Sequence, residues 1–563
     1  MMRSTSLLLP LFSGLAAATL ICRPEGPVLP KPALQDTPAI KDAAASLTKT
    51  LDAAVSGAIK AGWPVENVSF SLAVISKDQK DPGVPLWEYH HLATNNVIGT
   101  KKLDRDSQYL IGSVSKVISD YILLKSGVDI NTPVTKYLSE LKDSPSRIRW
   151  EDVTLKMLAS QLSGAPTNYG FSEFYYLKEV FLATASIPNS RTISYQVLTI
   201  ALDFLKGMTK SYPVVAPMER PAYSNIAYTI LVMAIEEATG KNYTQLVENI
   251  VAKPLDLQNT VPSPGDDKRA VIPPGDSGWG ADYGYNAPGG GLVSSLGDLS
   301  KFAHAIMTRS IDLTPTQVRQ WLKPQAYSGG FSAVGMPWEI FRPHNLTPKH
   351  PHPVTIFVVD EYGLSLVVLT AGPMNAVTFL TDAILGTFVP AADEASRAQA
   401  KKEYARTFKS GCAKNNTSMI DVSFDLDNHS LVISSIRRNG SDILAAMTKI
   451  WSMTMGQFTS NFGSTVRLFP ADLDEKTTLH GKPVTSEVWR LWPEFASIGE
   501  SDLPRSGTLM DDCVMWTLGD WVHYGGEPMD RVLFYRDGDG HVVGFEAPFL
   551  RSGILQLAKN ISD

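Results

Sequence analysis

The segment 111–118, Ile-Gly-Ser-Val-Ser-Lys-Val-Ile, constrains this chain most, because it places two reactive side chains where an extended run meets a helix. The extended run 108–111 ends at Gly112, and a helical pattern of apolar positions then continues to Gly127. Ser113 and Lys116 are three positions apart at the start of that helix, so both side chains project from one side. A serine hydroxyl attacks only after a base takes its proton, and lysine is such a base where burial lowers its pKa.

Spacing alone does not identify this pair as a site. Ser46 with Lys49, and Ser139 with Lys142, have the same separation in the sequence. Ser113 differs from both because it alone follows a glycine at a junction between an extended run and a helix. This setting makes Ser113 and Lys116 the candidate catalytic residues.

The length and composition limit the classes of protein to consider. At 563 residues the chain should form two or so domains, each with a sizeable core. Hydrophobic residues make up 44% and charged residues 19%, which is typical of a globular chain and not of a disordered one. The net charge of −6 provides no basic surface, so nucleic acid is not expected as a partner.

The N-terminus predicts a secreted protein. Residues 1–18 have the features of a signal peptide, with a charged start, an apolar run over 7–15 and small residues at 16–18. No later stretch reaches about 18 uninterrupted apolar residues, so no membrane partner is expected. Export would allow glycosylation at the asparagines that begin Asn-x-Ser/Thr motifs, which are Asn67, Asn242, Asn345, Asn415, Asn416, Asn428, Asn439 and Asn560. It would also allow Cys412 and Cys513 to form a disulfide, whereas Cys22 is either free or removed with the signal.

The first two thirds of the chain predict an α+β sandwich over residues 65–395. A proline-rich lead and a helix are expected over 19–64, and one stripe of this helix carries Ile40, Ala44, Leu47, Leu51, Val55 and Ile59. Strands are expected over 69–75, 86–90, 354–359 and 364–370, and residues 360–363 join the last two.

Helices are expected between these strands. A short apolar helix and a glycine turn occupy 150–164, and a later helix over 226–239 ends at Gly240. Tyr223 and Asn225 lie at the mouth of that later helix, where polar side chains can point into a cleft. The glycine-rich segment 288–295 predicts a tight turn before a helix; a phosphate loop is the alternative, but the required Lys-Ser/Thr is missing.

Residues 405–563 predict a second domain that is rich in strands. A helix near 376–388 and a charged stretch over 393–406 place the boundary near residue 400. The short strands favour an antiparallel barrel or sandwich, and they are expected over 419–424, 430–434, 466–469, 488–492, 514–518, 532–535 and 541–546. Residues 537–540, Asp-Gly-Asp-Gly, are favoured as a hairpin turn over a calcium loop, because the later glutamate is missing.

These motifs together resemble the serine β-lactamase and penicillin-binding protein superfamily, on its class C-like branch. Ser113-Val-Ser-Lys116 matches the Ser-x-x-Lys signature, and Tyr223-Ser-Asn225 matches the Tyr-x-Asn element. The likeness spans residues 65 to 390 or so, and the order of the motifs is more specific than any one of them. The chain is most similar to the secreted β-lactamase-like proteins of fungi, which carry a β-rich C-terminal extension.

The resemblance implies that Ser113 attacks the carbonyl of a small ester or amide and forms an acyl-enzyme, without a cofactor or a metal. Lys116 and Tyr223 would share the proton transfers, and Asn225 would orient the substrate or Lys116. A phenol beside a lysine ammonium is pushed towards phenolate, which predicts that Tyr223 is a competent base. The alternative is that Tyr223 and Asn225 only cap a helix.

The chain departs from this superfamily at a third element, a Lys or His, then Thr or Ser, then Gly, on a strand that lines the cleft. This element binds a substrate carboxylate and supplies an N–H to the oxyanion hole. We expect it just after residue 357, but the chain continues directly into Val358-Val-Asp-Glu-Tyr-Gly363. The segment 349–353 cannot replace it, because its prolines lack N–H groups, and a linker is favoured there over a metal site of His350 and His352.

Losing a single oxyanion donor costs about 10²–10³ in kcat, so the departure bears directly on function. Either the protein is a weakly active or inactive member of the superfamily, or the sequence omits a coding segment. Three functions stay open: a secreted serine hydrolase, a binding protein that has lost the chemistry, and an acyltransferase of secondary metabolism that uses the same site.

Overall fold

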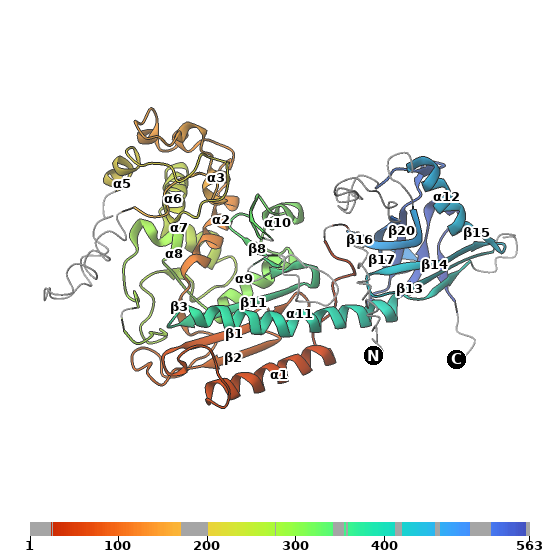
Figure 1. Cartoon of the computed structure of the whole chain (residues 1–563), viewed down its shortest axis with the longest axis horizontal. Coiled ribbons are helices and arrows are strands. Elements are labelled where there is room, and N and C mark those ends of the chain that lie inside the picture. The colour runs from red at the N-terminus through yellow and green to blue at the C-terminus, as the bar shows by residue number, and fades with distance from the viewer. Residues whose placement is uncertain are drawn as a thin grey trace, which may run out of the picture. The chain divides into compact units, whose positions relative to one another are not determined.

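The computed structural model describes residue 24 and residues 26–169, 201–275, 277–330, 332–341, 354–355, 358–410, 419–455, 462–495 and 519–558 (Figure 1). The chain divides into two compact units, one of residues 31–396 and one of residues 1–30 with 397–563. The expected signal peptide, the Cys412–Cys513 pair, and Asn345, Asn415, Asn416 and Asn560 lie outside the described residues.

The larger unit is built on an eight-stranded sheet with the order β2-β1-β11-β10-β9-β8-β7-β6. Strand β1 (Ser69–Ser76), second from one edge, pairs antiparallel with β2 (Trp87–His91) and with β11 (Leu364–Ala371), which confirms the expected strands there. Its side chains alternate between two hydrophobic cores, one on each face of the sheet. The other strands are β10 (Val358–Val359), β9 (Val354–Thr355), β8 (Glu339–Phe341), β7 (Ser332–Val334) and β6 (Ala326–Gly329).

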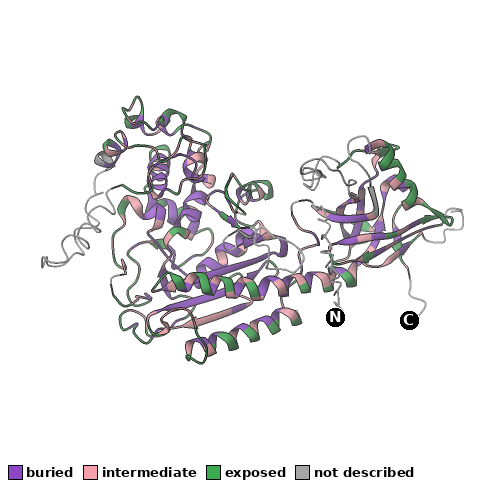
Figure 2. Ribbon diagram, in the orientation of Figure 1, coloured by how far each residue is buried: buried purple, intermediate pink, exposed green. Residues whose placement is uncertain are grey.

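Two helices, α1 (Pro38–Val55) and α11 (Asn375–Glu403), cover one face of this sheet (Figure 1). Their sides toward the sheet are buried and their outer sides are exposed (Figure 2). The expectation that Ile59 shares the stripe of α1 is wrong, because the helix ends at Val55 and Ile59 is 46% exposed. The charged stretch expected at the domain boundary lies mostly inside α11, which continues to Glu403 instead of ending before it.

Among the described helices, α11 alone is long and apolar enough to cross a membrane by length and composition. Its residues Leu380, Ile384, Phe388 and Ala392 are buried in the core beneath the sheet. This packing is that of a core helix.

A mainly helical region covers the other face of the sheet. Its central helices α2 (Ser115–Lys125) and α6 (Asn225–Thr239) are buried on nearly all sides. Around them lie α3 (Leu155–Ala159), α5 (Ala201–Met208), α7 (Tyr243–Leu246), α8 (Ala287–Gly290), α9 (Leu296–Thr308) and α10 (Pro315–Trp321). A small sheet of β3 (Gln108–Leu110), β5 (Leu292–Ser295) and β4 (Val261–Pro262) supports the start of α2.

Two segments of this unit differ from the sequence expectations. Residues 288–295 do not form a simple turn: α8 is followed by β5, because β5 finds strand partners on both sides in β3 and β4. The expected single strand over 354–359 is divided into β9 and β10, which pair antiparallel through Thr355 and Val358. An unbroken apolar run gives no indication of such a reversal.

The smaller unit is an antiparallel barrel, one of the two architectures that the sequence favoured. Its sheet has the order β13-β12-β22-β21-β20-β17-β16-β14-β15, and an additional β13–β14 pairing closes the ring. Phe408, Phe424, Phe534 and Phe545 fill the interior, with ring centroids 4.9 to 6.0 Å apart. The strands are β12 (Thr407–Lys409), β13 (Ile420–Leu426), β14 (Leu431–Arg438), β15 (Ser441–Asp442), β16 (Phe462–Leu479), β17 (Lys482–Phe495), β20 (Arg531–Arg536), β21 (Val542–Glu546) and β22 (Leu555–Leu557).

The smaller unit also contains a turn that the sequence predicted and two elements that it did not. Residues 537–540 form the turn between β20 and β21, and the Asp537 carboxylate accepts from two backbone N–H groups of that turn, which confirms the hairpin. Helix α12 (Ile443–Met455) was not expected. A small hairpin of β18 (His523–Tyr524) and β19 (Glu527–Pro528) lies apart from the main sheet, and the expected strand over 514–518 lies outside the described residues.

Candidate active site

Ser113 lies in a 3₁₀ turn, Gly112–Val114, between β3 and α2. Gly112 has φ +52°, in the left-handed region that glycine adopts readily, so the chain can turn sharply into the helix. Two hydrogen bonds to β5 fix this junction: Ile111 N donates to Leu292 O, and Leu292 N donates to the Ser115 hydroxyl. Ser113 is therefore exposed just before α2, whereas Lys116 is the second residue of α2 and only 2% exposed.

The Lys116 amine contacts three acceptors. Its Nζ lies 3.1 Å from Ser113 Oγ and 2.8 Å from Asn225 Oδ1, and it also donates to the carbonyl of Gly289. Asn225 Oδ1 and the carbonyl of Gly289 can only accept hydrogen bonds. When Lys116 is neutral, its two N–H groups satisfy these two acceptors, and its lone pair then faces Ser113 Oγ.

Burial lowers the pKa of Lys116 to about 8, and the carboxyl groups of Glu339 and Asp120 oppose that shift. A lysine with a pKa near 8 is neutral in a substantial fraction of molecules at physiological pH. Lys116 therefore combines the geometry and the pKa that a general base for Ser113 requires.

Tyr223 lies just before α6, with its hydroxyl 2.5 Å from Ser113 Oγ. Its side chain is 42% exposed, so it borders both the nucleophile and the solvent. Burial of the ring raises the pKa of Tyr223, and the negative charge of Glu339 acts in the same direction. The expectation that Tyr223 is a phenolate is thus not supported, because desolvation outweighs the hydrogen bond from Ser113 and Lys116 is itself easily deprotonated.

Asn225 has both ends of its amide engaged by the protein. Its Oδ1 accepts from Lys116, and its Nδ2 donates to Asn168 Oδ1 at 2.8 Å. Of the two roles that the resemblance implied for Asn225, this geometry favours orienting Lys116 over binding substrate.

Gln161 holds the backbone on both sides of Tyr223. Its carbonyl accepts from Ala222 N at 2.9 Å, and its side-chain Oε1 accepts from Ser224 N at 2.7 Å. Gln161 is only 3% exposed and follows α3, in the glycine turn that the sequence predicted. The position of the Tyr223 hydroxyl therefore depends on Gln161.

The turn after Gln161 also determines the path of the loop that carries Tyr223. Gly164 has φ +71°, and a Cβ there would lie 2.2 Å from the carbonyl oxygen of Val215. The carbonyl of Gly164 accepts from Val214 N, so the two segments run close together. A side chain at position 164 would separate them.

Asp120 and Tyr228 form a buried pair beneath Lys116 that the sequence analysis missed. The Tyr228 hydroxyl lies 2.6 Å from the carbonyl of Ala159 and 3.1 Å from Asp120 Oδ2. The Tyr228 hydroxyl is the donor in both contacts, so its one proton is shared between the two acceptors. Burial raises the pKa of Asp120 well above its usual range, whereas the hydrogen bond from Tyr228 and the charge of Lys116 act in the opposite direction. The sequence feature that could have revealed this pair is Asp120 itself, an acidic residue inside the apolar run of α2, four positions after Lys116.

Glu339, on β8, is a second acidic residue that the sequence analysis missed. Its charge raises the pKa of both Lys116 and Tyr223, although no described residue is bonded to its carboxylate. The described strands from β10 to β11 contain no Lys/His-Thr/Ser-Gly sequence, so the third element is not found where the resemblance required it. Residues 349–353 lie outside the described residues.

The remaining predicted residues are glycosylation candidates on the surface of the two units. Asn242, Asn428 and Asn439 are exposed, and Asn67 is partly buried. Asn242 caps α7 through its Oδ1, which accepts from Gln245 N, so its amide nitrogen is not used in that bond.

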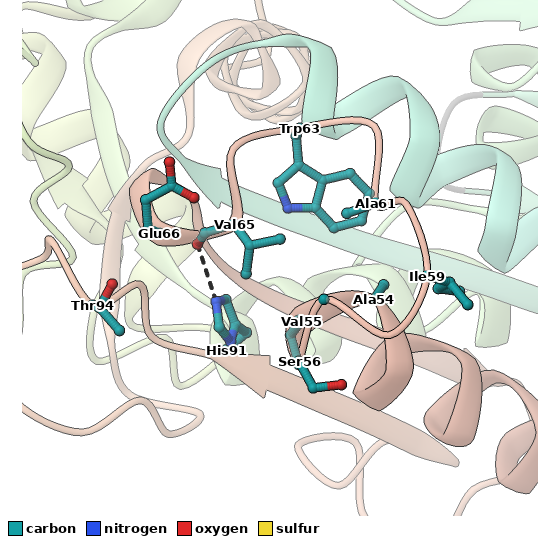
Figure 3. A pocket seen from close by; sticks show the side chains of 11 residues that line it. Ala54, Val55, Ser56, Ile59, Ala61, Trp63, Val65, Glu66, His91 and Thr94 are labelled. Atoms are coloured by element: carbon teal, nitrogen blue, oxygen red, sulfur yellow. Dashed lines mark hydrogen bonds between the residues drawn. The ribbon is translucent and has the colours of Figure 1, made fainter.

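A pocket of about 410 Å³ lies away from these residues, between the C-terminal end of α1 and the end of β2 (Figure 3). It is lined by Trp63, Ile59 and His91 among others, and His91 Nε2 lies 3.3 Å from the carbonyl of Val65. Burial lowers the pKa of His91, so this imidazole is neutral at pH 7. The pocket holds no nucleophile and base in contact, unlike the site at Ser113.

Comparisons with known proteins agree with this geometry. The β-lactamase family profile matches residues 73–382, and a profile described as a β-lactamase-like C-terminal domain matches residues 396–557. The chain therefore belongs to the β-lactamase family, which confirms the resemblance and the expected fold.

Within that family, one relative is similar over nearly the whole chain. A β-lactamase-like protein of Arthroderma benhamiae is 43% identical over 583 positions, which cover 96% of this chain and 97% of the relative. Since this chain has 563 residues, at least 20 of those 583 positions have no counterpart here.

Two more distant proteins are similar to this chain at lower identity. A probable hydrolase, M10, of Phoma sp. is 24% identical and covers 84% of this chain and 82% of its own length. The octameric penicillin-binding protein homologue from Pyrococcus abyssi aligns with 79% of this chain and 97% of its own, at 17% identity and a TM-score of 0.46. The matching β-lactamase profile places this protein in a family of β-lactamase-like hydrolases.

Proposed function

We propose that this protein is a secreted serine hydrolase that cleaves a small ester or amide through an acyl-enzyme on Ser113. The proposal rests on the contact between the buried amine of Lys116 and the exposed hydroxyl of Ser113, which lie 3.1 Å apart. Two acceptors hold the amine so that its lone pair faces that hydroxyl, and burial keeps its pKa near 8.

Acylation begins when neutral Lys116 takes the proton of Ser113 as Oγ forms a bond to the substrate carbonyl carbon. The bond to the leaving group then breaks, and the leaving group takes a proton from the Tyr223 hydroxyl. Tyr223 recovers a proton from the Lys116 ammonium, and Lys116 thereby becomes neutral again. A protonated Tyr223 suits this role because its raised pKa keeps the proton available at every working pH.

Deacylation repeats these transfers with water. Lys116 takes a proton from a water molecule, and the oxygen of this water attacks the acyl carbon. The bond between the acyl carbon and Ser113 Oγ then breaks, and Ser113 Oγ regains a proton. The Ser113 N–H, in the first turn before α2, has no acceptor within the helix and is a candidate donor to the oxyanion. With the third element missing, we expect turnover to be slow.

Secretion is part of the proposal and rests on the N-terminal sequence features. Expression of the full chain in a eukaryotic host, with N-terminal sequencing of the protein from the medium, tests it. Cleavage near residue 18 is expected, and retention of the protein inside the cell with an intact N-terminus would contradict secretion.

A screen of aryl esters and amides tests the hydrolase, with Ser113→Ala as the inactive control. Turnover that depends on Ser113 is expected for at least one compound class. Saturable binding without turnover, unchanged in Ser113→Ala, would instead favour the binding protein that the missing third element suggests. Addition of alcohols or amines as competing acceptors separates a hydrolase from an acyltransferase.

A further inference from the structure

The amine of Lys116 lies over the faces of two tyrosine rings. Its Nζ is 4.8 Å from the ring centroid of Tyr223 and 5.5 Å from that of Tyr228. A cation within about 6 Å of a ring centroid is attracted by the negative charge of the ring face, most strongly where water is excluded. Tyr223 is 42% exposed, whereas Tyr228 is fully buried. Of the two rings, Tyr228 therefore provides the contact that is removed from water.

Two hydrogen bonds from its hydroxyl hold the Tyr228 side chain in this position. The hydroxyl donates to the carbonyl of Ala159, at the end of α3, and to Asp120 Oδ2 in α2. Asp120 follows Lys116 by four positions, so these two side chains lie on the same face of α2. The far end of the Tyr228 side chain is thus bonded to the helix that carries Lys116, one turn beyond the amine.

The other direct contacts of the Lys116 amine are with neutral groups. Its hydrogen-bond acceptors are a hydroxyl, an amide oxygen and a backbone carbonyl. The carboxyl groups of Asp120 in α2 and Glu339 in β8 raise the pKa of Lys116, but neither is one of these contacts. Helix α8, which packs against α2, presents the carbonyl of Gly289 and no titratable side chain, and Glu248, on another segment packed against α2, is exposed. The two ring faces are therefore a large part of the direct surroundings of a charged Lys116.

We propose that Tyr228 is a positioning residue of the proposed hydrolase, and that its ring stabilises the ammonium that Lys116 forms on taking the proton of Ser113. The inference rests on the proposed function and adds to it a residue that acts through Lys116 without touching the substrate. Burial holds the pKa of the Tyr228 hydroxyl well above its ordinary value, so Tyr228 keeps its own proton throughout. Without the ring the ammonium would be less stable, and the pKa of Lys116 would fall below about 8.

Replacement of Tyr228 by phenylalanine and by pentafluorophenylalanine tests the ring face. Both side chains lack the hydroxyl and have nearly the same shape, but fluorination reverses the charge distribution of the ring. The midpoint of the pH profile of kcat/KM on a neutral ester should lie about one pH unit lower with the fluorinated ring than in Tyr228→Phe. Equal midpoints in these two variants would overturn the inference.

Tyr228→Leu provides the same comparison if the fluorinated protein does not fold. This substitution removes the ring face altogether, so its midpoint should also lie below that of Tyr228→Phe. A midpoint equal to or above that of Tyr228→Phe would overturn the inference.

Tyr243 is the matched control, because it is another buried tyrosine that is bonded to α2. Its hydroxyl lies 2.9 Å from Ser119 Oγ, but its ring is not one of the two over which the Lys116 amine lies. The same substitutions at position 243 should therefore leave the midpoint unchanged. An equal fall at positions 228 and 243 would mean that they act by disturbing α2 in general, which would overturn the inference.

A titration of Lys116 without substrate separates this inference from the hydrolase proposal. The full-length protein is labelled with carbon-13 at the lysine Cε atoms, and the NMR signal of Lys116 is assigned by its absence from Lys116→Met. If no ester is hydrolysed, a lower Lys116 midpoint with the fluorinated ring than in Tyr228→Phe still supports the role of the ring. Equal midpoints overturn it, whether or not any ester is hydrolysed.

Discussion

The hydroxyl of Tyr223 lies 2.5 Å from Oγ of Ser113, although 110 positions separate the two residues in the chain. The contact unites the start of α2 with the start of α6, and Lys116 bonds to residues at both. An exposed nucleophile, a buried base and a partly exposed phenol thus lie in contact with one another. Each of the following predictions concerns the protonation or the position of one of these groups.

The pH dependence of kcat/KM should report the pKa of Lys116. Because the base acts only when neutral, activity should rise with pH to a midpoint near 8 and fall about tenfold for each unit below it. Initial rates between pH 5.5 and 9.5 on one neutral ester measure the profile. A rate that is constant from pH 6 to 8 would exclude Lys116 as the base.

Replacing Tyr223 by phenylalanine should lower kcat by about 10²-fold or more, because the leaving group loses its proton donor. The melting temperature should change little, since the side chain is 42% exposed. Tyr212→Phe, on the same loop and 66% exposed, is the control that should retain full activity. Equal kcat values for Tyr223→Phe and the wild type would remove Tyr223 from the mechanism.

Asn225→Asp should move the acidic limb of the pH profile to higher pH, by a unit or more. The new carboxylate would lie about where Oδ1 now contacts Lys116, and an adjacent negative charge raises the pKa of an amine. Asn168→Asp places the same charge one contact farther from Lys116, so its shift should be smaller. A shift in the opposite direction would mean that Asn225 does not face the amine.

Gln161→Ala should lower kcat more than it changes KM, because it frees the backbone at Ser224 and lets Tyr223 move. Ser160→Ala is the matched control: it loses one part-buried hydrogen bond, from Ser160 Oγ to Lys156 O, which lies at the end of α3 and not in the loop of Tyr223. Both variants should lose about 1 kcal/mol of stability. Equal kcat values in the two variants would contradict a positioning role for Gln161.

The local part of the site could be predicted from the sequence, because it depends on neighbours along the chain. Ser113 and Lys116 are three residues apart, so any helical start brings them together. The start of α6, with Tyr223 and Asn225 before its apolar run, was equally visible. The sequence pattern alone did not predict that Tyr223 and Asn225 lie beside Ser113. Only the resemblance implied that they share one site.

The rest of the site depends on burial and on distant strands. Tyr223 keeps its proton because burial of its ring raises its pKa, and a local sequence pattern does not predict that burial. Trp321 holds the segment before β8 against Tyr121 of α2, and these two aromatic residues lie 200 positions apart in the chain. The long strand β16 was similarly underestimated, since residues 472–478 are exposed and mostly polar and are held in the strand by pairing with β17.

Acylation of Ser113 by a serine-reactive probe shows whether this hydroxyl is activated. The purified protein is treated with a fluorophosphonate probe, and its intact mass and a peptide map are recorded beside those of Ser113→Ala. We expect one adduct, located on Ser113 and absent from the variant, that forms faster as the pH rises through 8. A folded protein that gains no adduct, or one that is labelled equally in Ser113→Ala, would contradict an activated serine at this position.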